Sequence, residues 1–461
     1  MVETTDIFKA INAVIPVDQL LYEDQISEDY GHDEIGTIFH LPDIVVKAES
    51  TENVSAVMKI ANEYRFPVVV RGAGTGLVGG SISTDGGIML DLSGMKKIKE
   101  LDIDNFTLTV EPGVLLSEIK EFTEDKGFFY PPDPGEKSAT IGGNISTNAG
   151  GMRAIKYGVT RDYVRALTVV LPNGKIAHLG GKVVKNSSGF DLKDLIIGSE
   201  GTLGIVTEAT LKLVMLPKIT TSLLVPFNDF ESTINVVPIL LRSGITPTAM
   251  EFFEQNSVDF WEQFTGKVFP ENQHNSYLLL SFDGQEQAEI EAEYEQIAEL
   301  CLSNAAEDVY VLDDKNQRDI VWTARGAFLE AIKSSTTEMD EADIVVPRSK
   351  IVEYIQFVHQ TAIDQAIRIP GFGHVGDGNL HFYVCRDDYD DATWKAKLTA
   401  VFDALYAEGK AIGGQVSGEH GIGIAKKVYL KKSADEASYS TMLAIKAAID
   451  PKNILNPGKV I

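Results

Sequence analysis

Cysteine is scarce in this chain of 461 residues, which contains only Cys301 and Cys385. The two residues are far apart and share no short motif. An iron–sulfur cluster needs about four thiolates, so the chain cannot hold one by itself. A low cysteine count is also typical of proteins in a reducing compartment. We therefore expect a cytoplasmic protein.

Long apolar runs are absent as well. No stretch reaches the ~20 apolar residues that a membrane-spanning helix needs. The first ten residues, MVETTDIFKA, have neither the basic start nor the apolar core of a signal peptide. The sequence predicts neither a membrane span nor a secretion signal.

Positive charge is also in short supply, with 41 Lys and Arg against 67 Asp and Glu, for a net charge of −26. Such a surface repels nucleic acid and anionic lipid, and we exclude both as partners. The apolar content of 44% supports full-sized cores. A chain of this length predicts two or three domains.

Histidine is the last scarce residue, and its distribution is uneven. Of eight histidines, three lie in two glycine-bracketed stretches, GHVGDGNLH and GEHG. Glycine lets backbone, ligand and metal approach closely. Two imidazoles and a carboxylate are a usual ligand set for Zn²⁺ or a non-haem metal with open positions. These stretches predict a divalent-metal site (Zn, Fe or Mn) with the ligands His374, His381 and Glu419.

His420 then stands beside the metal as a free base for a proton on a metal-bound hydroxyl. The alternative is that His374 and His381 are loop histidines with ordinary hydrogen-bond partners. Asp377 and Asn379 are expected to fix the loop or to support the ligands.

Hydrophobic periodicity alternates between helix and strand patterns, which predicts an α+β fold. Helices are expected at Thr51–Tyr64, Leu115–Lys126, Asp229–Arg242, Gln285–Leu302 and Tyr439–Ile449. The main expected strands are Val68–Val70, Ile88–Leu92, Thr107–Val110, Ala166–Leu171, Gly204–Leu213, Ser222–Pro226, Tyr277–Phe282 and Asp343–Pro347. Pro217 marks the expected boundary between the first domain and the second.

Three glycine-rich segments lie in the first half of the chain, at residues 71–81, 138–151 and 198–206. A Rossmann nicotinamide fingerprint needs a helix that starts inside the first run. The glycines and Ser81 near the end of that run oppose a helix and favour a loop of backbone N–H groups around phosphates. The fourteen residues of the second run, mostly of small or hydrogen-bonding type, suit a ligand cradle. Together the segments predict a large cofactor that carries a polyphosphate.

The three segments resemble the FAD-binding domain of the vanillyl-alcohol oxidase and p-cresol methylhydroxylase superfamily. GFGHVGDGNLH, SGEHGIG and the terminal DPKNILNPGK resemble its FAD-linked D-2-hydroxyacid dehydrogenase branch, from about residue 38 to the end. The resemblance implies a two-lobed FAD-binding domain at 1–217, an α+β substrate domain with the metal loop at 218–418, and a segment at 419–461 that returns to the FAD domain. Because Gly74-Thr75-Gly76 stands at the usual position of a covalent flavin link, we expect non-covalent FAD.

Matched residue by residue, the resemblance implies three sets of FAD contacts. The pyrophosphate set is Arg71, Gly72, Ala73, Gly74, Thr75, Gly76, Gly79, Gly80 and Ser81. The set around the isoalloxazine and ribityl chain is Pro132, Thr140, Gly142, Gly143, Asn144, Thr147, Asn148, Gly150, Gly151, Tyr157 and Gly158. The set around the adenosine half is Glu200, Gly201, Gly204, Ile205 and Val206, and Asn456 is a further expected contact.

The resemblance also assigns Arg325 to the substrate carboxylate, which its planar fork can bind in bidentate fashion. The alternative is an arginine on a surface helix. Arg348 is a weaker second candidate, and Glu251 matches an acidic position without an assigned role. No extra cation is obvious around Lys333–Glu341, which favours a monocarboxylate.

The implied reaction is oxidation of a D-2-hydroxyacid, with D-lactate as the best single substrate and glycolate or D-2-hydroxyglutarate as alternatives. A zinc hydrolase would leave the first half unexplained, and a flavoprotein subunit that only relays electrons would make the metal loop structural. Electrons are expected to pass to an electron-transfer flavoprotein or to a separate iron–sulfur subunit. A homo-oligomer is possible from the sequence.

Overall fold

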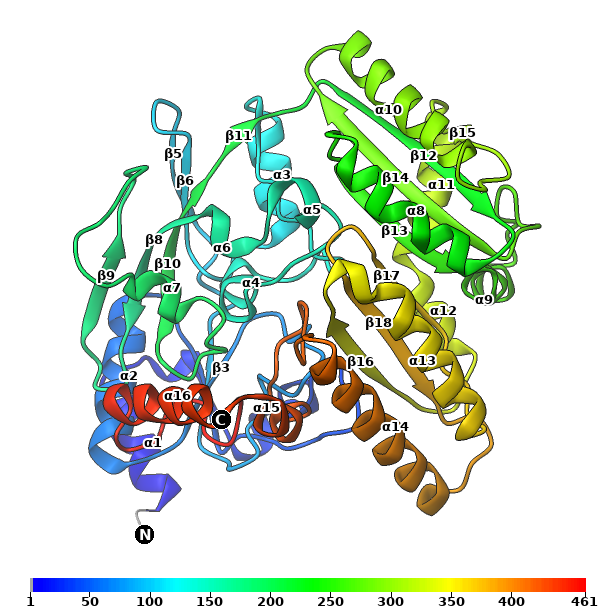
Figure 1. Cartoon of the computed structure of the whole chain (residues 1–461). Helices are drawn as coiled ribbons and strands as arrows, with labels where there is room; N and C mark the ends of the chain where they lie inside the picture. Colours follow the sequence, from blue (N-terminus) through cyan, green and yellow to red (C-terminus); the bar gives the residue numbers. More distant parts are fainter. Residues whose placement is uncertain (1–2) are drawn as a thin grey trace. The chain divides into compact units, whose positions relative to one another are not determined.

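The structure is a computed structural model that describes residues 3–461, and the chain forms two compact units (Figure 1). Unit 1 comprises Met1–Ala149, Val159–Leu216 and Glu419–Ile461. Unit 2 comprises Gly150–Gly158 and Pro217–Gly418. The short segment Gly150–Gly158, which the sequence analysis places in the first domain, therefore belongs to unit 2.

Unit 1 contains a four-stranded sheet in the order β1-β2-β4-β3. Strand β4 pairs in parallel with both β2 and β3, and β1 pairs antiparallel with β2. The strands are β1 (Leu20–Tyr22), β2 (Ile44–Lys47), β3 (Val68–Arg71) and β4 (Ile88–Asp91). Parallel strands are usually covered on both faces, and β2, β3 and β4 are accordingly mostly buried.

Helix α2 (Thr51–Tyr64) covers this sheet and has the predicted bounds. The Ser50 side chain accepts a hydrogen bond from the backbone N–H of Asn53 and caps the helix. Its apolar face packs into the same core as the strands, with Ile60 and Tyr64 at the margin. The 3.6-residue periodicity thus identified both the helix and its buried side.

Unit 1 also contains a five-stranded antiparallel sheet in the order β5-β6-β10-β8-β9 and a two-stranded pair, β7 and β11. The strands are β5 (Ile98–Asp102), β6 (Thr107–Val110), β7 (Phe128–Phe129), β8 (Val164–Val170), β9 (Ile176–Gly180), β10 (Ile205–Lys212) and β11 (Val214–Met215). The remaining α-helices of this unit are α1 (Thr4–Asn12), α3 (Leu116–Glu124), α4 (Ile141–Thr147), α6 (Thr160–Tyr163), α7 (Leu192–Ile196), α15 (Lys427–Ser433) and α16 (Glu436–Ile449).

Unit 2 is built on one seven-stranded antiparallel sheet in the order β15-β12-β14-β13-β17-β18-β16. The strands are β12 (Ile219–Phe227), β13 (Ala249–Glu254), β14 (Ser276–Gly284), β15 (Tyr310–Val311), β16 (Met339–Val345), β17 (Gly371–His374) and β18 (Asn379–Cys385). The helices are α5 (Ala154–Tyr157), α8 (Phe230–Arg242), α9 (Gln255–Thr265), α10 (Gln287–Leu302), α11 (Lys315–Gly326), α12 (Phe328–Ser334), α13 (Ile351–Asp364) and α14 (Asp391–Ala411).

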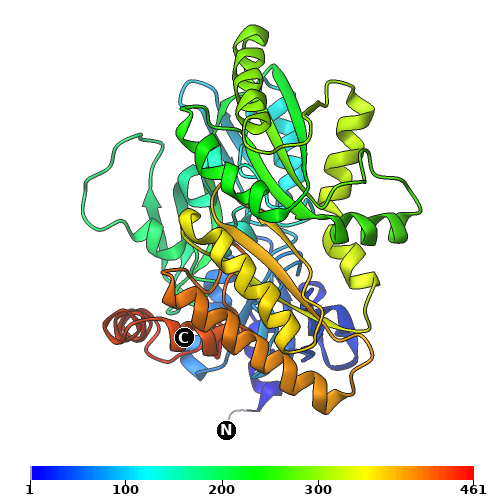
Figure 2. The same ribbon diagram turned by 45° about the vertical axis from the view of Figure 1, so that its right-hand side comes forward.

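The two faces of this sheet carry different helices. Helices α8, α10, α13 and α14 lie over one face, and α13 and α14 run side by side in Figure 2. Helices α9, α11 and α12 pack on the other face around an aromatic core that includes Phe253, Tyr277 and Phe372. Successive strand residues point to opposite faces, so every second residue of β13, β17 and β18 faces α11.

Strand β16 begins at Met339, earlier than the predicted start at Asp343. Its first part, Met339-Asp340-Glu341, lacks the apolar alternation that identifies a half-buried strand. The strand forms because it pairs with β18 along its whole length, from Met339 opposite Cys385 to Val345 opposite Asn379. Tertiary pairing here overrides local propensity.

The described residues contain no helix that is both long enough and apolar enough to cross a membrane.

Candidate active site

The two predicted metal-binding histidines lie on neighbouring strands of unit 2 and are buried. His374 ends β17 and His381 lies in β18, and their exposed fractions are 6% and 3%. Their ring centroids are 5.3 Å apart, with the ring planes at 87°. The predicted pair of neighbouring imidazoles is therefore present in the fold.

The turn between β17 and β18 requires glycine at Gly378. This residue has φ +91°, and a Cβ there would lie 2.2 Å from the carbonyl oxygen of Val346. Asp377 accepts a hydrogen bond from the backbone N–H of Asn379 (3.1 Å) within the same turn. The expectation that Asp377 fixes the loop agrees with this bond.

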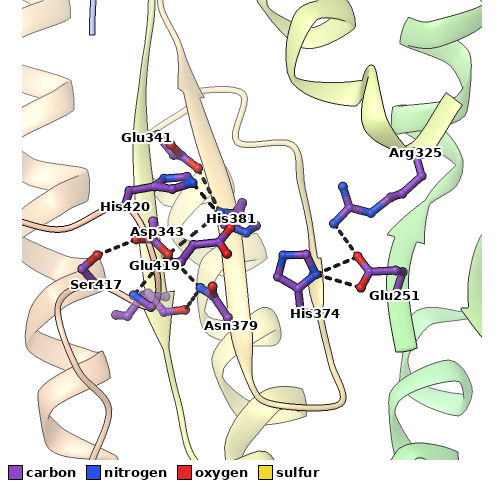
Figure 3. Close-up of polar contacts among 12 residues, drawn as sticks. Glu251, Arg325, Glu341, Asp343, His374, Asn379, His381, Ser417, Glu419 and His420 are labelled. Carbon is purple, nitrogen blue, oxygen red and sulfur yellow. Dashed lines mark hydrogen bonds and ion pairs between the residues drawn. The ribbon is translucent and has the colours of Figure 1, made fainter. Parts of the chain in front are cut away.

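Each histidine has a carboxylate partner on the same sheet face (Figure 3). Nδ1 of His374 lies 2.8 Å from both carboxylate oxygens of Glu251, which stands opposite it on β13. Nδ1 of His381 lies 3.0 Å from Oε1 of Glu341 on β16. Because a carboxylate accepts, Nδ1 donates in each pair, as in the carboxylate–histidine pairs that orient metal ligands.

Arg325 lies on α11 and is 5% exposed. The alternative of a surface-helix arginine is therefore wrong. Its Nη2 donates to Oε2 of Glu251 at 2.5 Å, and its guanidinium carbon lies 4.4 Å from the ring centroid of Phe372. Its Nε is buried and has no hydrogen-bond partner within residues 3–461. A buried donor in this state is unfavourable, and a ligand carboxylate would satisfy it.

Glu251 is completely buried between these groups. Burial acts to raise its pKa, but the adjacent His374 and Arg325 outweigh that effect, and the pKa lies below its usual value. The carboxylate is thus held ionised, which suits an acceptor for both partners.

Asp343 is a second fully buried carboxylate, in β16 opposite His381. It accepts hydrogen bonds from Asn379 Nδ2 (2.8 Å), Ser417 Oγ (2.6 Å) and the backbone N–H of Gly418 (3.2 Å). These bonds hold the chain at Gly418, the last residue of unit 2. Asn379 thereby has the supporting position that the sequence predicts for it.

Glu419 and His420 are the next two residues and open the last segment of unit 1. Oε1 of Glu419 lies 3.5 Å from Nε2 of His420, so the two side chains are neighbours rather than diverging as on a regular strand. A single peptide bond joins Glu419 to Gly418.

Arg348, the second candidate for binding the substrate carboxylate, is placed differently from Arg325. Arg348 is exposed, in the short helix Arg348–Lys350. Lys333 on α12 is also exposed. Neither side chain has the buried, ion-paired setting of Arg325.

The first glycine-rich segment of unit 1, residues 71–81, contains no helix, as the sequence predicts. Within residues 3–461, none of the backbone N–H groups from Gly72 to Val78 donates a hydrogen bond. Such a row of available N–H groups fits the phosphates of a dinucleotide. Five of the predicted pyrophosphate contacts, Gly72 to Gly76, lie in this row of N–H groups.

The second segment, which the sequence analysis describes only as a ligand cradle, contains helix α4. The side chain of Thr140 caps this helix by accepting from the backbone N–H of Gly143. Helix propensity does not predict this helix, because the two adjacent glycines at its start disfavour a helical backbone. Gly142 donates its N–H to the carbonyl oxygen of Pro112 and is thus already engaged.

Hydrogen bonds made by Asn456 and Glu200 connect the three glycine-rich segments. Asn456 Nδ2 donates to the carbonyl oxygens of Gly80 (3.1 Å) and Glu200 (2.7 Å), and the N–H of Glu200 donates to the carbonyl oxygen of Ser146 (2.8 Å). The Oδ1 atom of Asn456 is buried without a partner within the described chain. The convergence of these segments fits a bound dinucleotide.

The Glu200 carboxylate accepts from the backbone N–H groups of Ile422 (2.7 Å) and Gly423 (2.8 Å). Burial raises its pKa despite these bonds. Glu200 therefore holds the segment that follows His420.

Four of the predicted flavin contacts, Gly150, Gly151, Tyr157 and Gly158, belong to unit 2. Tyr157 donates its hydroxyl to Asp283 Oδ1 (3.0 Å), and Lys156 Nζ lies 2.6 Å from the same oxygen. The short segment is thus anchored to β14.

Two family models match the chain. One, described as the C-terminal domain of FAD-linked oxidases, matches residues 216–460, and another, described as an FAD-binding domain, matches residues 42–180. This chain belongs to the FAD-linked oxidase family. The predictions of an FAD-linked enzyme and of FAD as cofactor are confirmed by these matches.

Two relatives in this family align over nearly the whole chain. The D-lactate dehydrogenase of Anaerostipes hadrus is 45% identical over 448 residues, which cover 96% of this chain and 94% of the relative. The glycolate oxidase subunit GlcD of Bacillus subtilis is 38% identical over 432 residues, which cover 94% of this chain and 91% of the relative.

Among solved structures, p-cresol methylhydroxylase with substrate bound is similar, with a TM-score of 0.80 at 18% identity, covering 99% of this chain and 96% of that chain. At this identity the likeness shows the fold, and it confirms the predicted α+β fold of the vanillyl-alcohol oxidase type.

Sequence reasoning did not identify three residues that shape this site: Glu341, Asp343 and Phe372. One signal was available, because Glu341 and Asp343 alternate on a segment that precedes an apolar run. Read as a strand, that spacing puts both carboxylates on one face.

Proposed function

We propose that this FAD-linked enzyme oxidises a D-2-hydroxyacid, with D-lactate as the preferred substrate. One observation carries the proposal: two histidines, each oriented by a carboxylate, share a sheet face with a buried arginine that has a free donor. The relative most similar among those described above is named a D-lactate dehydrogenase, which supports the choice of acid.

The residues have separate roles in the proposed reaction. Arg325 binds the substrate carboxylate through its guanidinium. His420 accepts the proton of the 2-hydroxyl, and such help is typically worth ~10²–10⁴ in rate. FAD, when bound, supplies the two-electron acceptor for the hydrogen on C2.

His374, His381 and Glu419 are proposed as ligands of one divalent metal. A metal of this kind, when bound, lowers the pKa of a coordinated hydroxyl. The two histidines present Nε2 on one face of unit 2. Glu419 follows Gly418, whose N–H is fixed to Asp343 beside His381, and consecutive Cα atoms are only about 3.8 Å apart. This short tether supports Glu419 as the third ligand.

The glycine-rich segments of unit 1 are proposed to hold FAD without a covalent link. Acid denaturation should then release the flavin into the supernatant. Flavin that stays with the precipitated chain would show a covalent attachment.

The decisive experiment mixes the purified yellow protein with a panel of hydroxyacids under anaerobic conditions. D-lactate should bleach the flavin fastest, ahead of L-lactate, glycolate and D-2-hydroxyglutarate. Faster bleaching by glycolate or D-2-hydroxyglutarate would identify those acids instead. No bleaching by any of them would favour a flavoprotein subunit that only relays electrons.

The reduced flavin is proposed to pass its electrons to a separate protein, with an electron-transfer flavoprotein as the first candidate. The net charge of −26 supports a salt-sensitive encounter with a partner of complementary charge. D-lactate-driven reduction of a purified electron-transfer flavoprotein should exceed reduction of oxygen, NAD⁺ or a water-soluble quinone. Faster reduction of oxygen or NAD⁺ by the isolated chain would contradict this.

A further inference from the structure

Glu251 is a buried acid that the proposed reaction does not use. It is completely buried, yet it contacts two residues with different proposed tasks. We propose that Glu251 is a positioning residue whose single carboxylate holds both His374, a metal ligand, and Arg325, the substrate anchor. This inference rests on the proposed function and deepens it.

The backbone places Glu251 for this role. Strands β13 and β17 are antiparallel neighbours, and Glu251 stands directly opposite His374 in their register. Side chains directly opposite each other point to the same face. That face also receives α11, which carries Arg325 (Figure 3).

The Glu251 carboxylate contacts His374 and Arg325 at the same time. Both of its oxygens lie 2.8 Å from Nδ1 of His374, and Oε2 lies 2.5 Å from Nη2 of Arg325. A carboxylate can accept about four hydrogen bonds, so it serves both donors together. Its neighbours on the same face, Leu279 opposite and Phe253 two residues along, are apolar and buried.

Arg325 is held by more than this ion pair. The Phe372 ring lies 4.4 Å from the guanidinium carbon and restricts its plane. With Nη2 donating to Glu251 and Nε without a partner in the described chain, the guanidinium has donors left for a ligand. Glu251 therefore orients the arginine without saturating it.

A shared carboxylate predicts that one substitution impairs two functions. In Glu251→Gln, His374 loses its charged acceptor and Arg325 loses its counter-charge. Loss of such a supporting carboxylate typically lowers metal affinity 10–100-fold. The KM for D-lactate should also rise, and it should stay raised when metal is saturating, because the arginine defect does not depend on metal.

The experiment uses the full-length chain with FAD bound, stripped of metal by a chelator. The Kd for Mn²⁺ and for Zn²⁺ is measured by competition with a chromophoric chelator, and the KM for D-lactate is measured at saturating metal. The matched control is Glu254→Gln on the same strand, whose carboxylate contacts His359 at 3.1 Å outside the site. The control should match the wild type in both values.

Glu251→Gln leaves a buried arginine without its partner and could fail to fold. The double variant Glu251→Gln/Arg325→Met removes both charges and should fold. It should still bind metal 10–100-fold more weakly than the wild type, because His374 lacks its carboxylate.

Three results would overturn the inference while leaving the proposed function intact. They are wild-type metal affinity in Glu251→Gln, wild-type metal affinity in the double variant, and a KM in Glu251→Gln that returns to the wild-type value at saturating metal. A wild-type chain that oxidises D-lactate but binds neither metal would instead overturn the proposed metal site, and this inference with it.

Discussion

The two units build their candidate binding surfaces from different parts of the chain. In unit 1 the glycine loop from Gly72 to Val78 offers a row of backbone N–H groups. In unit 2 the site consists of side chains: Glu251, His374, Arg325 and His381 are all buried on one sheet face. A backbone cradle tolerates side-chain changes but not added bulk, whereas a buried charge network fails when one member is removed.

The largest effect should come from His374→Ala in unit 2. Removing a ligand forfeits metal stabilisation worth several kcal/mol, so kcat/KM for D-lactate should fall by at least ~10²-fold. Bound metal, measured by elemental analysis, should fall with it, while the flavin spectrum stays unchanged because His374 is not among the predicted flavin contacts. The control is His359→Ala, the carboxylate-paired histidine on α13. Full activity in His374→Ala, or in thoroughly chelated wild type, would refute a metal-assisted mechanism.

Arg325→Lys should have the next largest effect. Lysine keeps the charge but loses the planar fork, and a hydrogen bond to a charged group is worth about 1.5–3 kcal/mol. We expect a raised KM and a kcat/KM for D-lactate lowered by roughly 10–100-fold, measured by steady-state kinetics. Arg348→Lys, at an exposed position, should behave like the wild type. Unchanged kinetics in Arg325→Lys would leave Arg325 as only the counter-charge of Glu251.

A neighbouring pair in the glycine loop tests the backbone cradle of unit 1. Gly74 has φ +77°, and a Cβ there would lie 2.1 Å from Nη2 of Arg71. Gly74→Ala should therefore distort the loop and weaken FAD binding by roughly 5–150-fold, as strain of 1–3 kcal/mol implies. Thr75→Ala removes only a side chain and should leave the Kd for FAD nearly unchanged, as measured by flavin fluorescence. A larger loss in Thr75→Ala than in Gly74→Ala would mean that side chains build this site too.

The smallest effect should come from Asp33, a buried acid near the same loop. Burial raises the pKa of Asp33 to about 6, from 3.8. Because the folded chain binds this proton more tightly, the contribution of Asp33 to stability is fully present below about pH 3.8 and is lost as the pH rises through about 6. Asp33→Asn abolishes that loss, so its melting temperature should exceed that of the wild type by about 2–4 °C at pH 8 and by less at pH 4. Calorimetry at both pH values checks this, with exposed Asp104→Asn as the control. An equal difference at both pH values would rule out titration of Asp33 as the cause.

Local sequence patterns were enough to predict helix α2 and to indicate the family. Periodicity gave α2 with its correct bounds, and its buried side followed because helical spacing needs no long-range information. The glycine segments and the histidine stretches, GHVGDGNLH and GEHG, identified the family by resemblance, because its motifs are long and follow one another in a fixed order. Helix α4, in contrast, is not predicted by its sequence, because two glycines lie at its start. In the structure the side chain of Thr140 caps this helix.

Only the tertiary structure decided which side chains meet. The sequence contains Glu251 and Arg325 as isolated candidates, 74 positions apart, and no local rule pairs them with each other or with His374. Strand register does so, because antiparallel pairing of β13 with β17 puts Glu251 opposite His374, and packing of α11 on that face brings in the guanidinium. Residue type thus determined what chemistry was available, and long-range pairing determined which groups share it.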